Sequence, residues 1–174
     1  MSFDIFLARF ERGELVDAPR GSVLAVLRTH RYSGPDQFGF YNVELQDGDS
    51  VEFSARGLES QEPFQKCALH VRRFGPGLAG FLFDIASAGR FAVVPAMDGN
   101  PVFLVESEMK ADLPADMLRD LRPVLVSSAS ALADGLSGGF KAWAEYLDHV
   151  LGARASSQEG RGGPTTGIWT PPVK

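Results

Sequence analysis

Three glycines near the middle of the chain have the spacing of a phosphate-binding turn. Gly75, Gly77 and Gly80 stand in G-x-G-x-x-G order, after a strand-like run and before a helix-like run. In dinucleotide-binding units such glycines let the backbone approach a pyrophosphate at the amino terminus of the helix. This chemistry would make the chain a small-molecule or nucleotide-binding enzyme that uses the Gly75–Gly80 turn.

The residues around these glycines favour a structural role. The strand of a dinucleotide-binding unit is buried on both faces, but here it contains Arg72 and Arg73, which point to opposite faces. The acidic residue expected downstream, Asp98, stands in the turn signal MDGN, which predicts a hairpin. We therefore interpret the first two glycines as a turn and Gly80 as a position of close packing. The nucleotide-binding enzyme is kept as the alternative.

A second glycine motif, GLSGG at residues 135–139, matches the G-x-S-x-G pattern of hydrolase nucleophiles. That motif requires a strand running directly into the turn, whereas the helix-like ASALAD precedes Ser137. Asp148 and His149, the acid and base available downstream, are neighbours on one expected helix and face different directions. We expect a flexible joint between helices here.

The sequence contains no pattern typical of a metal or cofactor site. His30, His70 and His149 lie far apart without metal-ligand spacing. Cys67 is the single cysteine, so neither an intrachain disulfide nor a cysteine metal cluster can form. We expect it to be a buried structural residue. These observations predict no cofactor, no metal and, on balance, no enzyme.

Composition narrows the classes of partner. The chain of 174 residues carries a formal charge of -5, so it lacks the basic field that supplies most nucleic-acid affinity. Charged residues interrupt the apolar run at the amino terminus, which argues against a signal peptide. No run approaches the roughly 18 to 20 apolar residues of a membrane span. We expect a cytoplasmic protein with neither nucleic acid nor membrane as partner.

The apolar pattern predicts an α+β fold with a mixed or mostly antiparallel sheet packed by three to four helices. A single domain is expected over residues 1–152, followed by a Gly/Pro-rich tail over residues 153–174. Glycines interrupt the last apolar repeat, so two helices or one broken helix are expected there. The predicted strands are residues 3–10, 38–45, 50–56, 67–74, 91–96, 101–106 and 124–128, and the main helices are residues 19–30, 76–88 and 129–151.

The strands FGFYNVEL and SVEFSAR form a predicted hairpin with an acidic face. An odd-numbered loop centred on Gly48 pairs Val43 with Phe53 and places Glu44 directly opposite Glu52. Like charges across a strand pair are mildly destabilising. The pair is either part of a solvated face, screened by water and salt, or an acidic patch that receives a cationic partner.

Aromatic residues next to this hairpin could anchor a partner. YSGPDQFGFY places four aromatic side chains beside a turn, and IWTPP in the tail offers another on a flexible arm. As core or hairpin residues they would need no binding role. Under the binding interpretation the contact residues are Glu44, Glu52, Tyr32, Asp36, Phe38, Tyr41 and Trp169.

The segments MSFDIFLARF, YSGPDQFGFYNVELQDGDSVEFSARGL and GGFKAWAEY resemble small bacterial proteins of the immunity-protein-like kind. The resemblance covers residues 1 to about 151 and defines no catalytic or binding residue. It implies a protein that binds and neutralises a secreted toxin. The leading expectation is therefore a non-enzymatic protein-binding domain, with a basic bacterial effector as partner. A structural subunit of a larger assembly is the third possibility.

Overall fold

The structure, a computed structural model, describes residues 3–97, 99, 101–141, 145 and 149. Its short strands are apolar runs bounded by turn residues, as the sequence pattern predicts. The strands of the large sheet are β1 (Phe3–Ala8), β4 (Arg31–Ser33), β5 (Phe40–Glu44), β6 (Ser50–Ser54), β7 (Lys66–Val71), β8 (Ala92–Pro95), β9 (Pro101–Leu104) and β10 (Arg122–Leu125). A separate two-stranded sheet joins β2 (Phe10–Glu11) and β3 (Glu14–Leu15).

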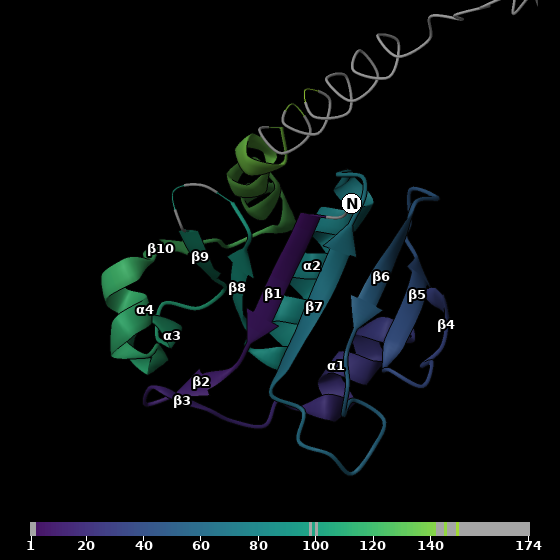
Figure 1. The fold of residues 1–174 in the computed structure, drawn as a ribbon, viewed down its shortest axis with the longest axis horizontal. Helices are drawn as coiled ribbons and strands as arrows, with labels where there is room; N and C mark the ends of the chain where they lie inside the picture. The colour runs from purple at the N-terminus through teal and green to yellow at the C-terminus, as the bar shows by residue number, and fades with distance from the viewer. Residues whose placement is uncertain (1–2, 98, 100, 142–144, 146–148, 150–174) are drawn as a thin grey trace, which may run out of the picture.

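The large sheet has eight strands in the order β10-β9-β8-β1-β7-β6-β5-β4 (Figure 1). Neighbouring strands are antiparallel except β9 and β10, which run parallel. Five helices accompany the sheet among the described residues. The α+β class with a mostly antiparallel sheet, expected from the sequence, is confirmed. The predicted tail over residues 153–174 lies outside the described residues.

Side-chain alternation gives the sheet a covered and an open face. On β1, Phe3, Ile5 and Leu7 are buried, while Asp4 and Phe6 point to the other side and Phe6 is 50% exposed. The same period of two continues across the neighbouring antiparallel strands. We call the uncovered side of β1, β7, β6, β5 and β4 the open sheet face. Its side chains are Asp4, Phe6, Ala8, Arg31, Ser33, Phe40, Asn42, Glu44, Ser50, Glu52, Ser54, Lys66, Ala68 and His70.

Helices cover the opposite side of these strands. In Figure 1, α1 (Arg20–Leu27) and α2 (Pro76–Gly89) lie behind the sheet. Their buried side chains join one core with the strands and with the helix over residues 129–141. Two short helices, α3 (Met109–Asp112) and α4 (Ala115–Asp120), lie beside β8 and β9, where Met109 contributes to a second, smaller core cluster. The open sheet face therefore starts at β1, next to the strands β8 and β9 that carry this cluster.

The amino terminus of α2 is occupied by a carboxylate of the chain itself. Asp47 Oδ2 accepts the backbone N–H of Gly77 at 2.8 Å, where a bound anion would sit in a phosphate-binding turn. A Cβ on Gly77 would lie 2.6 Å from this carboxylate. The preceding strand, β7, is antiparallel to both neighbours, whereas a dinucleotide-binding strand is parallel. The close packing predicted at Gly80 is wrong, because a Cβ there would meet nothing within 4 Å.

The helix over residues 129–141 is continuous, so the flexible joint predicted at its glycines is wrong. A Cβ on Gly135 would lie 2.5 Å from Cε1 of Phe103, and one on Gly139 equally close to Met97. These glycines let the helix approach the sheet instead of breaking the helix. Ser137 lies within the helix and its hydroxyl donates to the carbonyl of Asp134 at 3.0 Å, which is not the geometry of a nucleophile on a strand-to-helix turn.

Two alanine substitutions in this helix should change stability in opposite directions. A Cβ on Gly138 meets nothing within 4 Å, so Gly138→Ala should raise the free energy of unfolding by about 0.5–1 kcal/mol through helix propensity. Gly135→Ala forces a methyl group against the buried ring of Phe103 and should lower it by about 1–3 kcal/mol. Urea unfolding of both variants checks the pair. An increase for both would show that the helix does not pack this closely.

The central hairpin has the predicted faces but not the predicted register. Val43 pairs with Val51 instead of Phe53, and Glu44 pairs with Ser50 instead of Glu52. The loop is shorter than predicted, because Leu45 pairs through its N–H with the carbonyl of Asp49 at 2.7 Å and Gly48 takes the left-handed position with φ of 85°. A shift of two residues keeps every side chain on its face and changes only its partner.

Candidate functional site

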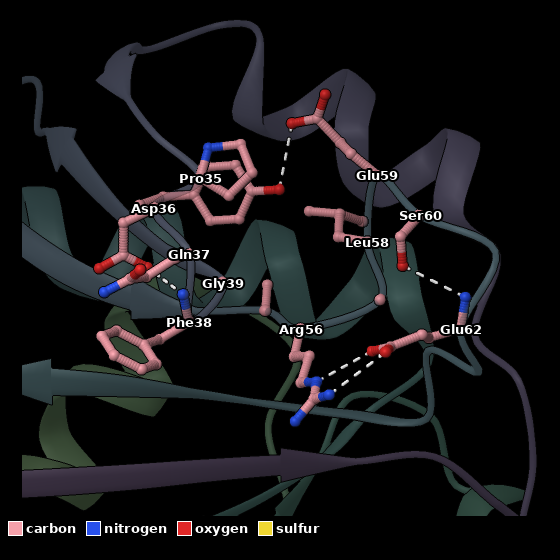
Figure 2. A pocket seen from close by; sticks show the side chains of 13 residues that line it. Pro35, Asp36, Gln37, Phe38, Gly39, Arg56, Leu58, Glu59, Ser60 and Glu62 are labelled. Atoms are coloured by element: carbon pink, nitrogen blue, oxygen red, sulfur yellow. Dashed lines mark hydrogen bonds and ion pairs between the residues drawn. The ribbon is translucent and has the colours of Figure 1, made fainter.

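A pocket lies at the end of β5 and β6, between the loops over residues 35–39 and 55–62 (Figure 2). We call it the loop pocket. Its volume is about 240 Å³. The walls come from sequence segments that the hairpin brings together, since the backbone N–H of Ala55 donates to the carbonyl of Gly39 at 3.0 Å. Of the predicted contact residues, Asp36, Phe38 and Tyr41 all line it.

Asp36 fixes the shape of the first loop. Its Oδ1 accepts the backbone N–H of Phe38 at 2.8 Å and that of Phe40 at 2.9 Å. A short acidic side chain that binds N–H groups just downstream is typical of tight loops. The result is that Phe38 is presented at the pocket mouth with its side chain 64% exposed.

The inner end of the loop pocket contains a buried tyrosine and a carboxylate. Tyr41 is 1% exposed, and its hydroxyl donates to Oε1 of Glu59 at 3.1 Å. Burial, and then the hydrogen bond and charge of Glu59, raise the pKa of Tyr41 above its ordinary value. The hydroxyl therefore stays protonated over the physiological range and holds the carboxylate in place.

An ion pair closes the outer side of the pocket. Arg56 donates from Nε to Oε2 of Glu62 at 2.9 Å and from Nη2 to Oε1 at 3.2 Å. In Figure 2 this pair lies across the pocket from Glu59. Two such parallel bonds fix the orientation of both side chains. Because the pair neutralises itself, the carboxylates of Asp36 and Glu59 set the local charge.

The open sheet face adjoins this pocket. A hollow that includes Asp36 continues from the loop onto the sheet beside Phe40, Asn42 and Glu52. A groove of about 580 Å³ shares Arg56 and Glu62 with the loop pocket and runs beside Phe6, where residues 62–68 pass. The loop pocket and the open sheet face are therefore adjacent parts of one continuous surface.

A row of polar side chains crosses three strands in the middle of the open sheet face. Cross-strand pairing places Asp4, His70 and Glu52 in one line from β1 through β7 to β6. His70 Nδ1–H donates to Asp4 Oδ1 at 2.9 Å, and the ring of Phe40 lies 5.7 Å from the imidazole. The carboxylate therefore orients the imidazole on the sheet. Sequence alternation could have placed Asp4 on this face, but not beside a residue 66 positions away.

The predicted contact residues do not share one face. Glu44 and Glu52 are exposed on the open sheet face, as predicted, but they are not opposite one another. Tyr32 and Tyr41 point to the covered side, where their rings lie 6.0 Å apart, so they are not exposed anchors. Each tyrosine is paired with a core residue of the next strand, and directly paired residues point to the same side of a sheet. Trp169 lies outside the described residues.

Sequence reasoning missed Glu59, Phe6 and His70 as parts of this surface. Glu59 stands in a polar loop that shows no periodicity, so the sequence held no signal for it. Phe6 alternates with buried residues and could have been recognised as outward-facing. These residues, with Phe38, replace the two tyrosines in the candidate surface.

Reactive groups and metal ligands do not gather here. Burial raises the pKa of the Cys67 thiol far above its ordinary value, so the thiol is unreactive, as expected for a structural cysteine. Within the described residues, no group of three or more histidine, cysteine or acidic side chains is arranged to hold a metal ion. Nor does any helix in the described ranges combine the length and apolarity needed to cross a bilayer.

Comparisons with family models, with curated proteins and with solved structures found no match to the chain.

Proposed function

We propose that the protein binds another protein stoichiometrically through the open sheet face and the loop over residues 35–39. The partner is a basic protein, and neutralisation of a bacterial effector by an immunity-like protein is the form of this function that the sequence resemblance favours. Binding requires no catalytic group and no cofactor. The observation that carries the proposal is a broad sheet face left without a helix among the described residues.

The chemistry of this face suits an interface. Phe38 and Phe6 are large apolar side chains exposed to 64% and 50%, and aromatic anchors of this kind contribute most of the binding energy in many complexes. Glu44 on β5 and Glu52 on β6 add exposed carboxylates to the same sheet face. Apolar anchors bordered by charges combine affinity with electrostatic selection of the partner.

The nucleotide-binding alternative is disfavoured by the same structure. Its anion position at the start of α2 is taken by Asp47. We therefore give the open sheet face priority over the glycine turn.

The two carboxylates should accelerate association with a basic partner. We expect Glu44→Gln/Glu52→Gln to slow association about tenfold at low salt and to weaken its salt dependence, with a smaller effect on dissociation. The partner is first recovered from native cell lysate at low salt and identified by mass spectrometry. Association rates are then measured by biolayer interferometry at several salt concentrations.

A matched control separates the face from net charge. Glu14→Gln/Glu108→Gln removes the same charge from exposed residues on β3 and beside α3, outside the open sheet face. We expect this control to keep most of the association rate. Equal slowing of association by both double variants would show that only net charge matters. Unchanged association kinetics in Glu44→Gln/Glu52→Gln would show that this face does not bind the partner.

A further inference from the structure

We propose that the groove beside Phe6 binds a small apolar monocarboxylate, a fatty-acid-like molecule with one carboxylate group. The inference goes beyond the proposed function, because it concerns a small ligand and can be tested without any partner protein. The site is the groove of about 580 Å³ where residues 62–68 pass the open sheet face. We call it the Phe6 groove.

The Phe6 groove arises from a change in side-chain size along one row of the open sheet face. Phe6 on β1 is paired with Ala68 on β7, which is paired in turn with Ser54 on β6. Directly paired residues point to the same side of a sheet, so two small side chains lie beside one large ring. The segment that leads into β7 also lines the groove, through Pro63 and Gln65. The small side chains therefore leave a hollow beside the ring.

The lining of the groove suits an apolar chain. Phe6 is 50% exposed, and Ala68 and Pro63 add further apolar surface. A ligand that covers this surface removes it from water, which favours binding. The volume of about 580 Å³ falls within the range of pockets that hold small molecules.

Lys66 sets the charge of the groove. Three charged side chains line it, and two of them, Arg56 and Glu62, bind each other through two hydrogen bonds. Lys66 lies on β7 two residues from Ala68, on the same side of the strand. It is exposed and forms no ion pair with any other described residue. One uncompensated positive charge beside an apolar hollow is complementary to an apolar molecule with a single negative charge.

The strands beneath the groove favour a free acid over the carboxyl terminus of a peptide. At Ala68, β7 is paired with β1 on one side and with β6 on the other. A peptide bound here would find no unpaired strand edge to extend, so main-chain hydrogen bonds of the sheet could not hold it. A free acid needs only the apolar contact and the charge.

The test titrates octanoate into the ¹⁵N-labelled protein and follows the amide signals of Ser54, Gln65 and Ala68. We expect saturable shifts at these positions with a dissociation constant on the order of millimolar. Octylammonium has the same chain length and the opposite charge, and it should bind about fivefold more weakly. The chain carries a formal charge of -5, so nonspecific adsorption would favour the cation instead. Equal or tighter binding of octylammonium would overturn the proposal.

Two variants assign the binding to the groove. Lys66→Gln should weaken octanoate binding about threefold, the effect of losing one exposed charge contact. Ala68→Leu fills the hollow and should weaken it about tenfold, with circular dichroism to check the fold. Lys110→Gln removes the same charge from α3, outside the groove, and should keep wild-type affinity. Equal octanoate affinity in Lys66→Gln and Lys110→Gln would overturn the role of Lys66, and because Lys66 is exposed this comparison holds even where Ala68→Leu does not fold.

A second probe separates the free acid from a peptide end. N-acetyl-leucine carries the carboxylate of a peptide carboxyl terminus together with an apolar side chain. We expect it to bind more weakly than octanoate, because it offers the groove a shorter apolar chain. Tighter binding of N-acetyl-leucine would assign the groove to a peptide terminus and overturn the free acid as its ligand.

The outcomes also separate this inference from the proposed function. Saturable octanoate binding, together with unchanged partner kinetics in Glu44→Gln/Glu52→Gln, would support the Phe6 groove and count against the acidic face. Absence of saturable shifts with octanoate, together with slowed association in that double variant, would overturn the groove and leave the proposed function standing.

Discussion

Phe53→Ala should be the most damaging single substitution among the residues beneath the candidate surface. We expect it to lower the free energy of unfolding by about 3–5 kcal/mol, since it removes a fully buried ring and leaves a cavity. Phe53 lies on β6 with its ring 6.0 Å from that of Tyr41 and 5.8 Å from that of Phe81 on α2. It thus joins the inner wall of the loop pocket to the helix layer. Urea unfolding followed by far-ultraviolet circular dichroism measures the loss.

An exposed phenylalanine of the same surface supplies the control. Phe38→Ala should change the free energy of unfolding by no more than about 0.5 kcal/mol, because its side chain already faces water. Phe53→Leu should fall between the two, because it keeps much of the buried apolar volume. A loss below about 1 kcal/mol for Phe53→Ala would contradict the packing described for this core.

The protein should lose stability steeply in alkaline solution. Burial raises the pKa of Cys67, and burial followed by the Glu59 carboxylate raises that of Tyr41. In the unfolded chain these groups ionise near their ordinary values of about 8.5 and about 10. As pH rises past each value, the unfolded state releases a proton that the folded state keeps, so unfolding becomes more favourable. Each group contributes a slope approaching about 1.4 kcal/mol per pH unit.

The full stability should therefore be present below about pH 8 and decline with increasing slope from about pH 9 upward. Urea unfolding at half-unit pH steps gives the slope. Cys67→Ala should reduce the loss of unfolding free energy at the lower pH values of the decline, and Tyr41→Phe should reduce it at the higher ones. Phe38→Ala removes no titrating group and should keep the wild-type slope. An unchanged slope in the Cys67→Ala/Tyr41→Phe double variant would show that other groups govern the alkaline transition.

In the central hairpin, the local sequence pattern predicted the faces of the strands but not their register. Its alternating apolar residues correctly predicted which side chains face the core, since a strand period of two is a property of the strand itself. The pairing of Glu44 with Glu52 was wrong because a shorter turn satisfies the same alternation. Only the hydrogen bonds of the loop, including the left-handed Gly48, select between the two registers.

Glycine spacing was informative about conformation and misleading about packing. The sequence predicted a helix after Pro76, which the structure shows as α2. It did not reveal that Asp47, from another segment, occupies the start of that helix. It predicted a joint at residues 135–139, although those glycines receive Phe103 and Met97 against an unbroken helix. A glycine in a helical pattern can mark either a break in the helix or a position where another side chain packs closely against it. The residues that surround the glycine in space decide between the two.

The sequence by itself determined the α+β class, the order of most strands and helices, and the sidedness of the two strands of the central hairpin. These features follow from the periodicity of apolar residues and from turn chemistry, which act within a few residues of one another. Only the tertiary structure decided that Asp4 orients His70, that Tyr41 holds Glu59, and that the loops over residues 35–39 and 55–62 enclose a pocket. Those contacts depend on strand order and register across the sheet, and many sequences with the same local pattern would bring different side chains together.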